Sequence, residues 1–417
     1  MKDGGECQRM NYQQKSIHGV RPHGETGETG LPTGDLCCGC GVCCVSCPTG
    51  AISMMPDCEG FLRPVVDQKK CIHCGRCVST CPSLKEERSR VPLEVFRVHA
   101  KDDDVRWGSA SGGLFALLAR AALDRGGVVF GAAYEHGSWR VVHKRADTYE
   151  ELEELRGSKY VQSDIGKCFL DVRACLAEGK NVLFSGCPCQ IAALRCFLGK
   201  DDPNLLLVDL ICHGVPSPTA WQAFLSDEES CHHHHLVSVA GRKNCKWNDF
   251  GMSLGFSDGS RLSFVGAFRQ NPYMAAYLNR WMNRRSCYRC RFRQFKSGSD
   301  LTIGDDWSYY PVSNEHDRTY GISCVFSNTE KGYSALKTIA EHSVVTAIDY
   351  DQAVCANLAV LKDDEMPKVR ETFYDLIRER GFLNAVDELL PKRDRPLLVH
   401  LAWWLKRLIV NHELNRF

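Results

Sequence analysis

The residues best suited to chemistry are eight cysteines that repeat one spacing, C-x2-C-x2-C-x3-C, with a proline after each copy. The two copies are Cys37, Cys40, Cys43 and Cys47, and Cys71, Cys74, Cys77 and Cys81. In this spacing three thiolates surround one cuboidal cluster, and the fourth points to the other cluster. We therefore predict two 4Fe–4S clusters. The first is held by Cys37, Cys40, Cys43 and Cys81, and the second by Cys71, Cys74, Cys77 and Cys47.

The same cysteines leave one alternative, a structural zinc module built from C-x2-C pairs. Zinc needs four ligands per site and gives no reason for the doubled pattern, so iron–sulfur clusters are favoured. Cys38, Cys44 and Cys58 are expected to be thiols near the clusters rather than ligands. Between the copies, AISMM and FLRPVVD are expected to pair as strands. Residues 35–85 thus resemble bacterial two-cluster ferredoxins and predict an α+β ferredoxin-like cluster module.

Cysteine usage also bears on the cellular compartment. The chain of 417 residues contains 24 cysteines, and half of them precede residue 82. Its N-terminal stretch lacks the features of a secretory signal, so the cysteines indicate metal or redox chemistry rather than disulfides. We expect a cytoplasmic protein without a spanning helix, because no apolar run reaches the required length of about 18–20 residues. The net charge of +1 gives no reason to expect a nucleic-acid partner.

The remaining chain divides by composition and periodicity. Residues 1–34 are polar and rich in Gly and Thr, which predicts a disordered segment. Residues 93–350 alternate strand-like and helix-like stretches, with an antiparallel section between about residues 236 and 265, which is typical of an α/β body. Residues 351–417 are expected to form a helical tail.

Three turns in this body contain glycine and polar groups. They are the stretches WGSASGG, RGSKYVQS and SGCPCQ, and two of them directly precede a predicted helix. Free backbone N–H groups at the start of a helix bind anions, although a plain N-cap with a glycine turn explains any one of these stretches equally well. Three such turns in one body favour a phosphate site of dinucleotide size. No G-x-G-x-x-G follows a strand, so an NAD-type domain is not predicted.

The turns belong to a longer series of motifs in a fixed order. Over roughly residues 95–345 the series is WGSASGG, GGVVFGAAY, VVHKRA, LRGSKYVQS, VLFSGCPCQIAAL, LVDLICHGVPSP, SCYRCRF and SDLTIGDDW. It resembles the family of coenzyme F-420 hydrogenase/dehydrogenase beta subunits, whose members often carry a two-cluster ferredoxin module. The resemblance implies a cluster module at residues 35–85, an α/β flavin-binding body at residues 93–350 and a helical C-terminal tail.

The resemblance also implies an oxidoreductase. Such a protein moves electrons between 4Fe–4S clusters, FAD and a hydride-exchanging substrate, namely coenzyme F-420 or another conjugated small molecule. A flavin fits this position because it exchanges one or two electrons. The alternative is an electron-transfer subunit without its own substrate, which serves a partner enzyme, for example beside polysaccharide pyruvyl-transfer genes. In either case a ferredoxin or another redox subunit is the expected protein partner.

By the same resemblance, nine residues of the three turns are candidate FAD contacts. They are Ser111, Gly112, Gly113, Lys159, Tyr160, Gln162, Gly186, Pro188 and Gln190. Lys159 could neutralise the pyrophosphate or lie near the reducible edge of the flavin. The alternative for Lys159 is a solvated surface lysine.

Four further cysteines lie within the family motifs and could hold a third 4Fe–4S cluster beside the flavin. They are Cys189, Cys212, Cys287 and Cys290, and Cys187 competes for the first position. A zinc site and unliganded thiols are the two alternatives.

Other features suggest weaker hypotheses. The run from Cys231 to His235 is expected to be a solvated loop rather than a metal site, and Asp305–Trp307 form either a redox-site corner or a plain turn. An arginine cluster could dock an acidic ferredoxin or the polyglutamate tail of F-420, or be a solvated face, and consists of Arg284, Arg285, Arg289, Arg291 and Arg293. The apolar stretch at residues 396–412 could give peripheral contact with the inner face of the membrane, cover the body or bind a partner.

Overall fold

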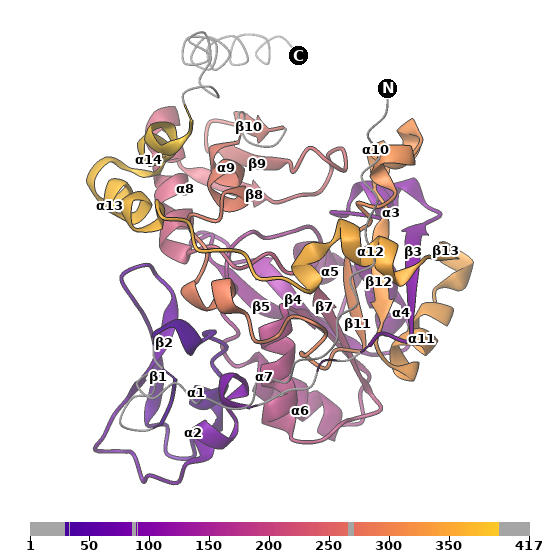
Figure 1. Cartoon of the computed structure of the whole chain (residues 1–417), viewed down its shortest axis with the longest axis horizontal. Helices are drawn as coiled ribbons and strands as arrows, with labels where there is room; N and C mark the ends of the chain where they lie inside the picture. The colour runs from indigo at the N-terminus through magenta and orange to yellow at the C-terminus, as the bar shows by residue number, and fades with distance from the viewer. Residues whose placement is uncertain (1–29, 33, 86–88, 90, 266–270, 392–417) are drawn as a thin grey trace.

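The computed structural model describes residues 30–32, 34–85, 89, 91–265 and 271–391, and Figure 1 shows their arrangement. A small module at the lower left of this view, here called the head, comprises residues 34–85. The remaining described residues form the body. The predicted segment at residues 1–34 lies mostly outside the described residues, although Leu31 is buried against Cys43 and Ile52 of the head.

The head is built from two short helices and a hairpin. Helices α1 (Val42–Ser46) and α2 (Arg76–Ser79) start within the two copies of the cysteine spacing. Strands β1 (Ile52–Pro56) and β2 (Leu62–Val66) pair antiparallel between them, with Met54 opposite Pro64. The predicted strand pair between the cysteine copies is therefore confirmed.

The body contains an eight-stranded mixed sheet in the order β13-β3-β12-β11-β7-β6-β4-β5. Neighbours in the segment β11-β7-β6-β4 are parallel, and the other neighbouring pairs are antiparallel. The strands are β3 (Glu94–Ala100), β4 (Val128–Tyr134), β5 (Val141–Ala146), β6 (Val182–Gly186), β7 (Leu205–Leu210), β11 (Leu301–Asp305), β12 (Ser323–Ser327) and β13 (Ser343–Ala347). All residues of β6 and β12 are buried, because helices cover both faces at these strands.

Alternate residues of these strands enter different cores. On one face, Val129 and Leu183 pack with α4 (Leu114–Leu123), α5 (Tyr149–Leu155) and α11 (Glu330–Lys337). On the other face, Phe130 and Phe184 pack with α6 (Cys168–Ala177), α7 (Pro188–Leu198) and Val42 of the head. The head therefore shares a hydrophobic core with the body.

A second layer lies above the main sheet in Figure 1. It combines a three-stranded antiparallel sheet with four helices around one aromatic core that includes Trp221, Tyr273 and Phe382. Its elements are α8 (Pro218–His232), β8 (Leu236–Ala240), β9 (Met252–Phe256), β10 (Arg261–Phe264), α9 (Pro272–Leu278), α13 (Arg370–Arg380) and α14 (Phe382–Leu389). The shorter helices α3 (Asp103–Trp107), α10 (Glu315–Tyr320) and α12 (Tyr350–Ala356) flank the main sheet.

The predicted alternation of strands and helices is confirmed, and so is the antiparallel section. Of the predicted tail, α12, α13 and α14 are helical, and the stretch at residues 396–412 lies outside the described residues. Within the part of the chain that the structure describes, no helix is long and apolar enough to cross a membrane. His233–His235 are exposed, as expected for a solvated loop.

The predicted arginine surface is wrong for two of its members. Arg284 and Arg293 are buried, at 0% and 8% exposure, and only Arg289 and Arg291 of the cluster are exposed. The basic residue types in this segment suggested a surface, but Arg284 and Arg293 donate to backbone carbonyls inside the fold.

A buried ion pair joins the head to α13. Both carboxylate oxygens of Glu59 accept from Arg370, at 2.7 Å from Nη1 and 2.5 Å from Nη2. The side chains are only 9% and 0% exposed, and the guanidinium also donates to the carbonyl of Asn283 at 2.9 Å. Two parallel charge-assisted hydrogen bonds fix the geometry of the pair. The C-terminal helices therefore hold the head in place.

We expect Glu59→Gln to lower the free energy of unfolding by about 3–5 kcal/mol, because it leaves the buried Arg370 cation unpaired. Chemical denaturation followed by tryptophan fluorescence measures this loss. The matched control is Asp375→Asn, which breaks a pair with Arg378 whose side chains are 60% and 55% exposed, and should cost at most about 1 kcal/mol. Equal losses in the two variants would contradict the structural role assigned to the buried pair.

Candidate functional site

A pocket of about 420 Å³ opens at the carboxyl ends of the parallel strands. Its floor includes Gly131 of β4, Gly186 of β6, Leu210 of β7 and Gly304 of β11. Ligands of open α/β sheets bind in the crevice outside the carboxyl ends of the strands. The volume also lies in the usual range for cofactor sites, about 300–1,000 Å³. Both observations make this pocket the candidate binding site.

The three glycine turns predicted to bind phosphate all reach this pocket. The first turn ends at Gly113, whose φ of 87° is a conformation that favours glycine, and α4 begins at the next residue. The second turn follows α5, and the third leads from β6 into α7. Turns that are far apart in the sequence therefore converge on one cavity.

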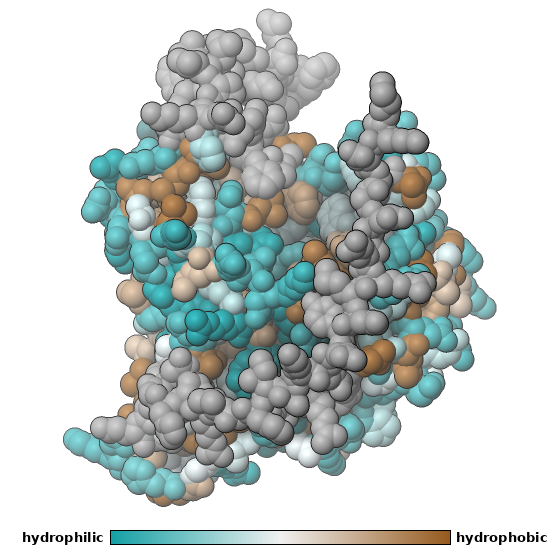
Figure 2. Space-filling model, in the orientation of Figure 1, coloured by the Kyte–Doolittle hydropathy of each residue, from teal (hydrophilic) through white to brown (hydrophobic). Residues whose placement is uncertain are grey.

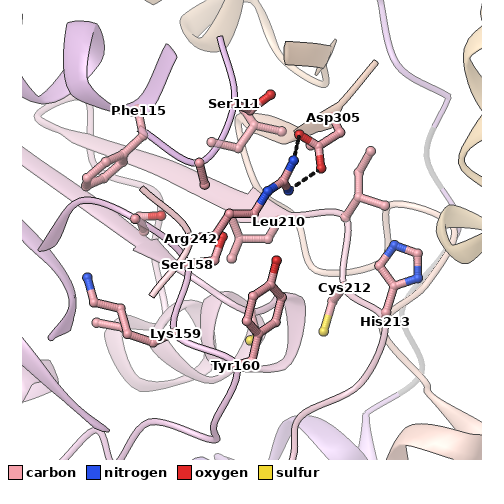
Figure 3. Close-up of a pocket in the computed structure, with 18 of the residues that line it drawn as sticks. Ser111, Phe115, Ser158, Lys159, Tyr160, Leu210, Cys212, His213, Arg242 and Asp305 are labelled. Atoms are coloured by element: carbon pink, nitrogen blue, oxygen red, sulfur yellow. Dashed lines mark hydrogen bonds and ion pairs between the residues drawn. The ribbon is translucent and has the colours of Figure 1, made fainter. Parts of the chain in front are cut away.

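Lys159 and Tyr160 line the pocket beside one another (Figure 3). The Lys159 ammonium donates to the carbonyls of Glu154 and Arg156, at 2.7 and 2.9 Å, and so caps the end of α5. Burial, and secondarily the nearby Lys243, hold the pKa of Lys159 well below its usual range. The alternative of a solvated surface lysine is therefore not what the structure shows.

An ion pair missed in the sequence forms one wall of the pocket. Arg242 binds Asp305, with 2.6 Å between Nη1 and Oδ2, and the Trp247 indole donates to Asp305 at 2.7 Å. The Tyr160 hydroxyl points toward the same guanidinium in Figure 3. Trp307 lines the pocket and stacks on Trp247 with ring centroids 5.2 Å apart. The Asp305–Trp307 stretch thus faces the pocket, except for Asp306, which pairs with Arg97 on β3.

His143 supplies an unused acceptor at the pocket wall. The imidazole is 6% exposed, and its Nε2 lies 3.0 Å from the carbonyl oxygen of Ser185, so Nε2 carries the proton and donates. Burial lowers the pKa of His143 to about 4, and the ring is neutral near pH 7. Nδ1 has no hydrogen-bond partner among the described residues. A ligand N–H or O–H group would satisfy this atom.

Not every predicted FAD contact lines the pocket. Ser111, Gly113, Lys159, Tyr160, Gly186 and Gln190 do. Gly112 packs against β3 and β12, where a Cβ atom would lie 2.5 Å from the Val98 carbonyl oxygen. Gln162 lies between head and body and donates to the Cys38 carbonyl at 2.9 Å. Pro188 lines a second, smaller cavity.

The charge of the pocket wall favours an anionic ligand. Its basic side chains are Arg156, Lys159, Arg242 and Arg280, and Asp305 is the one carboxylate that lines it among the described residues. Arg280 and Arg156 are paired with Asp364 and Glu153, which lie outside the pocket. Cations in a partly desolvated cleft attract phosphate and carboxylate groups. Apart from Lys159, these residues were missed, because only the tertiary fold brings them to the strand ends.

The second cavity, of about 50 Å³, adjoins the pocket and contains the four predicted third-cluster cysteines in its wall: Cys189, Cys212, Cys287 and Cys290. Cys212 lines both cavities. Cys187 lines the large pocket and donates a hydrogen bond to Cys212, which lowers the pKa of Cys212 to about 7. Sulfur ligands from three segments therefore meet at this wall, and a 4Fe–4S cluster fits this donor set.

The head cysteines follow the predicted crossed arrangement. Burial raises the pKa of Cys43, and the neighbouring Cys37 and Cys81 raise it further. Burial also raises the pKa of Cys77, with smaller contributions from Cys74 and Cys47. Each fourth cysteine thus lies beside the other copy, as two interleaved clusters require. Within the described residues, no three or more His, Cys, Asp or Glu side chains are gathered tightly enough for a single metal ion.

The two head sets differ in burial. We call Cys37, Cys40, Cys43 and Cys81 the inner set, and all four are buried. We call Cys47, Cys71, Cys74 and Cys77 the outer set, of which Cys74 is exposed and the others are partly buried. Cys38, expected to be a thiol near the clusters, contacts Cys40 of the inner set and accepts a hydrogen bond from Cys189 of the body. The inner set therefore adjoins the second cavity.

Family models identify both parts of this arrangement. Residues 95–169 and 179–353 match the N-terminal and C-terminal models of the coenzyme F420 hydrogenase/dehydrogenase beta subunit. Residues 36–84 and 63–114 match two models of the 4Fe-4S dicluster domain. The chain belongs to the family of coenzyme F420 hydrogenase/dehydrogenase beta subunits and carries a dicluster domain at its head.

Two relatives illustrate the breadth of this family. The chain is 23% identical over 189 residues to a subunit of the F(420)H(2) dehydrogenase of Methanosarcina mazei, with 43% of this chain and 53% of the relative covered, so the match spans about half of that protein. A chain of the F420-reducing NiFe hydrogenase complex from Methanosarcina barkeri is 16% identical, with a TM-score of 0.45 and 73% and 92% of the two chains covered.

Cys189 and Cys187 can be distinguished by iron content. We expect the unmodified chain, purified without oxygen, to contain about twelve irons, and Cys189→Ser to contain about eight, because the second cavity loses a ligand. Cys187→Ser is the matched control, two residues away, and should keep about twelve. About eight irons in the unmodified chain would exclude a third cluster, and loss in Cys187→Ser alone would exchange the two roles.

Proposed function

We propose that this chain is an iron–sulfur flavoprotein oxidoreductase, which moves electrons between a redox protein at its head and a hydride-exchanging substrate such as coenzyme F-420 in its pocket. The observation that carries the proposal is the position of Cys212 in the walls of both cavities. Together with the contact between Cys189 and Cys38, it places every predicted sulfur ligand in one continuous series from the surface to the pocket.

In this proposal FAD binds in the large pocket, and the chemistry that it supplies is exchange of one or two electrons. Ser111 and Gly113 lie at the start of α4, where backbone N–H groups would bind its phosphates. Lys159 and Arg242 supply positive charge at the opposite wall. His143 offers the unused Nδ1 acceptor, and Trp307 offers an aromatic face.

A second candidate function is electron transfer without a substrate of the chain's own. It is favoured by the name of the Methanosarcina mazei relative, which is called a dehydrogenase subunit. In that case the pocket would still hold FAD, and the second substrate would bind a partner enzyme. Turnover of F-420 by the chain alone separates the two functions.

We expect the anaerobically purified chain to release about one FAD on denaturation and to reduce F-420 with a reduced viologen dye as electron donor. Lys159→Met should weaken FAD binding roughly tenfold or more, since a hydrogen bond to a charged group contributes about 1.5–3 kcal/mol. Titration of flavin fluorescence measures this change. The control is Lys246→Met, which removes the same charge from an exposed lysine outside the pocket lining.

Two results would count against parts of this proposal. A chain that holds FAD and clusters but leaves F-420 unreduced supports the electron-transfer role instead. A colourless chain with no releasable flavin overturns both candidate functions.

The outer set lies on a basic surface suited to an acidic redox protein. Lys69, Lys70, His73 and Arg76 are exposed around Cys74, and Asp67 is the one exposed carboxylate in the described segment 67–77. Ile72 is 62% exposed at the centre of this group. Figure 2 shows hydrophilic side chains along the outer edge of the head. Charge complementarity of this kind increases the rate of association.

The double variant Lys69→Glu and Lys70→Glu should slow reduction by an acidic ferredoxin roughly tenfold at low salt, and the difference should shrink as salt screens the charges. Stopped-flow absorbance measures the rate. The control replaces Lys101 and Lys337 by Glu at the other side of the molecule, after β3 and in α11 (Figure 1). Equal slowing by both double variants would contradict docking at the outer set.

A further inference from the structure

One arginine at the contact between head and body is fully buried and has no carboxylate partner. Arg284 is 0% exposed and lies on the body, next to the segment that contains Cys287. Its Nε donates to the Cys37 carbonyl at 2.8 Å, and its Nη2 donates to the Leu62 carbonyl at 2.9 Å. Among the residues that the structure describes, no Asp or Glu forms an ion pair with it.

The guanidinium is directed at the inner set. Nη2 lies 3.7 Å from Cys37 Sγ, and Nη1 donates to the Gln162 side-chain oxygen at 2.9 Å. Arg284 also helps to lower the pKa of Cys38, although hydrogen bonds from Cys189 and Cys40 contribute more. Gly39 leaves room for it, because a Cβ atom there would lie 2.4 Å from Nη1. The backbone of the head is thus shaped around this cation.

An unpaired buried charge is expensive in a protein interior, and carbonyl dipoles compensate it only in part. The other buried arginines that join distant parts of the chain have carboxylate partners: Arg370 has Glu59, Arg106 has Asp317, and Arg242 has Asp305. A cluster held by four thiolates is anionic and would supply the missing negative charge. The position of Arg284 fits this group, since its nearest sulfur belongs to the inner set.

We propose that Arg284 is the counter-cation of the inner cluster and raises its reduction potential above that of the outer cluster. This inference rests on the proposed function, because it requires the inner set to hold a 4Fe–4S cluster. Reduction adds one negative charge, so a fixed cation in a dry site stabilises the reduced form more than the oxidised form. Cluster potentials respond to net charge, to hydrogen bonds at sulfur and to solvent exposure.

The outer set provides the contrast. Its nearby cations Lys69, Lys70 and Arg76 are exposed, so water and salt screen them. The two clusters therefore have different electrostatic surroundings although their cysteine spacing is the same. The difference favours an electron on the inner cluster, which is the one beside Cys38 and the body.

The test is a potentiometric titration of the full-length protein without oxygen, monitored by electron paramagnetic resonance of the reduced clusters. Arg284→Gln should lower the potential of one cluster by about 59 mV or more, which is a tenfold change in its ratio of reduced to oxidised forms. Arg284→Lys keeps the charge and should restore most of this shift. The matched control is Arg285→Gln, whose arginine is already paired with Glu371 and is 31% exposed.

A second variant guards against poor folding of Arg284→Gln. Gln162→Glu keeps the arginine and places a carboxylate at the position of the amide oxygen, 2.9 Å from Nη1, so it should also lower the potential of the same cluster. Unchanged potentials in Gln162→Glu and Arg284→Gln, with both clusters present, would overturn the inference and leave the proposed function intact. Absence of any cluster signal in the unmodified protein would instead overturn the proposed function.

Discussion

The structure depends on direct, buried contact between the head and the body. The contact is polar and specifically partnered: Arg284 and Gln162 bind each other and backbone carbonyls of the head, while Glu59 binds Arg370. Buried polar groups of this kind destabilise a fold unless every partner is present. The head is therefore fixed in one orientation, and the inner set is held against Cys189 rather than attached through a mobile linker.

The pocket depends on a different principle. Four parallel strands end at the same edge, and glycine turns at that edge leave backbone N–H groups and free space. The second layer closes the space, because Arg242 follows β8 and reaches Asp305 at the end of β11. A site built from strand ends and one long-range ion pair is rigid, and rigidity is what a bound redox cofactor requires of its protein.

The sequence could predict what is local. The cysteine spacing implies its own geometry, so the crossed sets and the hairpin between them were predictable, and so were the glycine turns at strand ends. It could not show which polar residues meet across long sequence separations. Arg242 and Asp305 are 63 residues apart, and Arg284 and Cys37 are 247 apart. Gln162 belongs to the same turn as Lys159, but extended backbone carries it past the pocket to the head. An arginine-rich stretch is ambiguous for the same reason, because a buried cation and a surface cation have the same letter.

The start of α7 explains how one short motif serves three neighbours. Cys187 is the N-cap residue, Pro188 begins the helix, and Cys189 follows at the second helical position. Side chains two positions apart at a helix start point in different directions. Cys187 therefore faces the pocket and Cys212, while Cys189 faces the second cavity and Cys38 of the head. Because β6 ends directly before this motif, the same backbone turn that opens the pocket also positions the sulfur beside the head. The spacing C-P-C-Q thus connects pocket, second cavity and head within four residues.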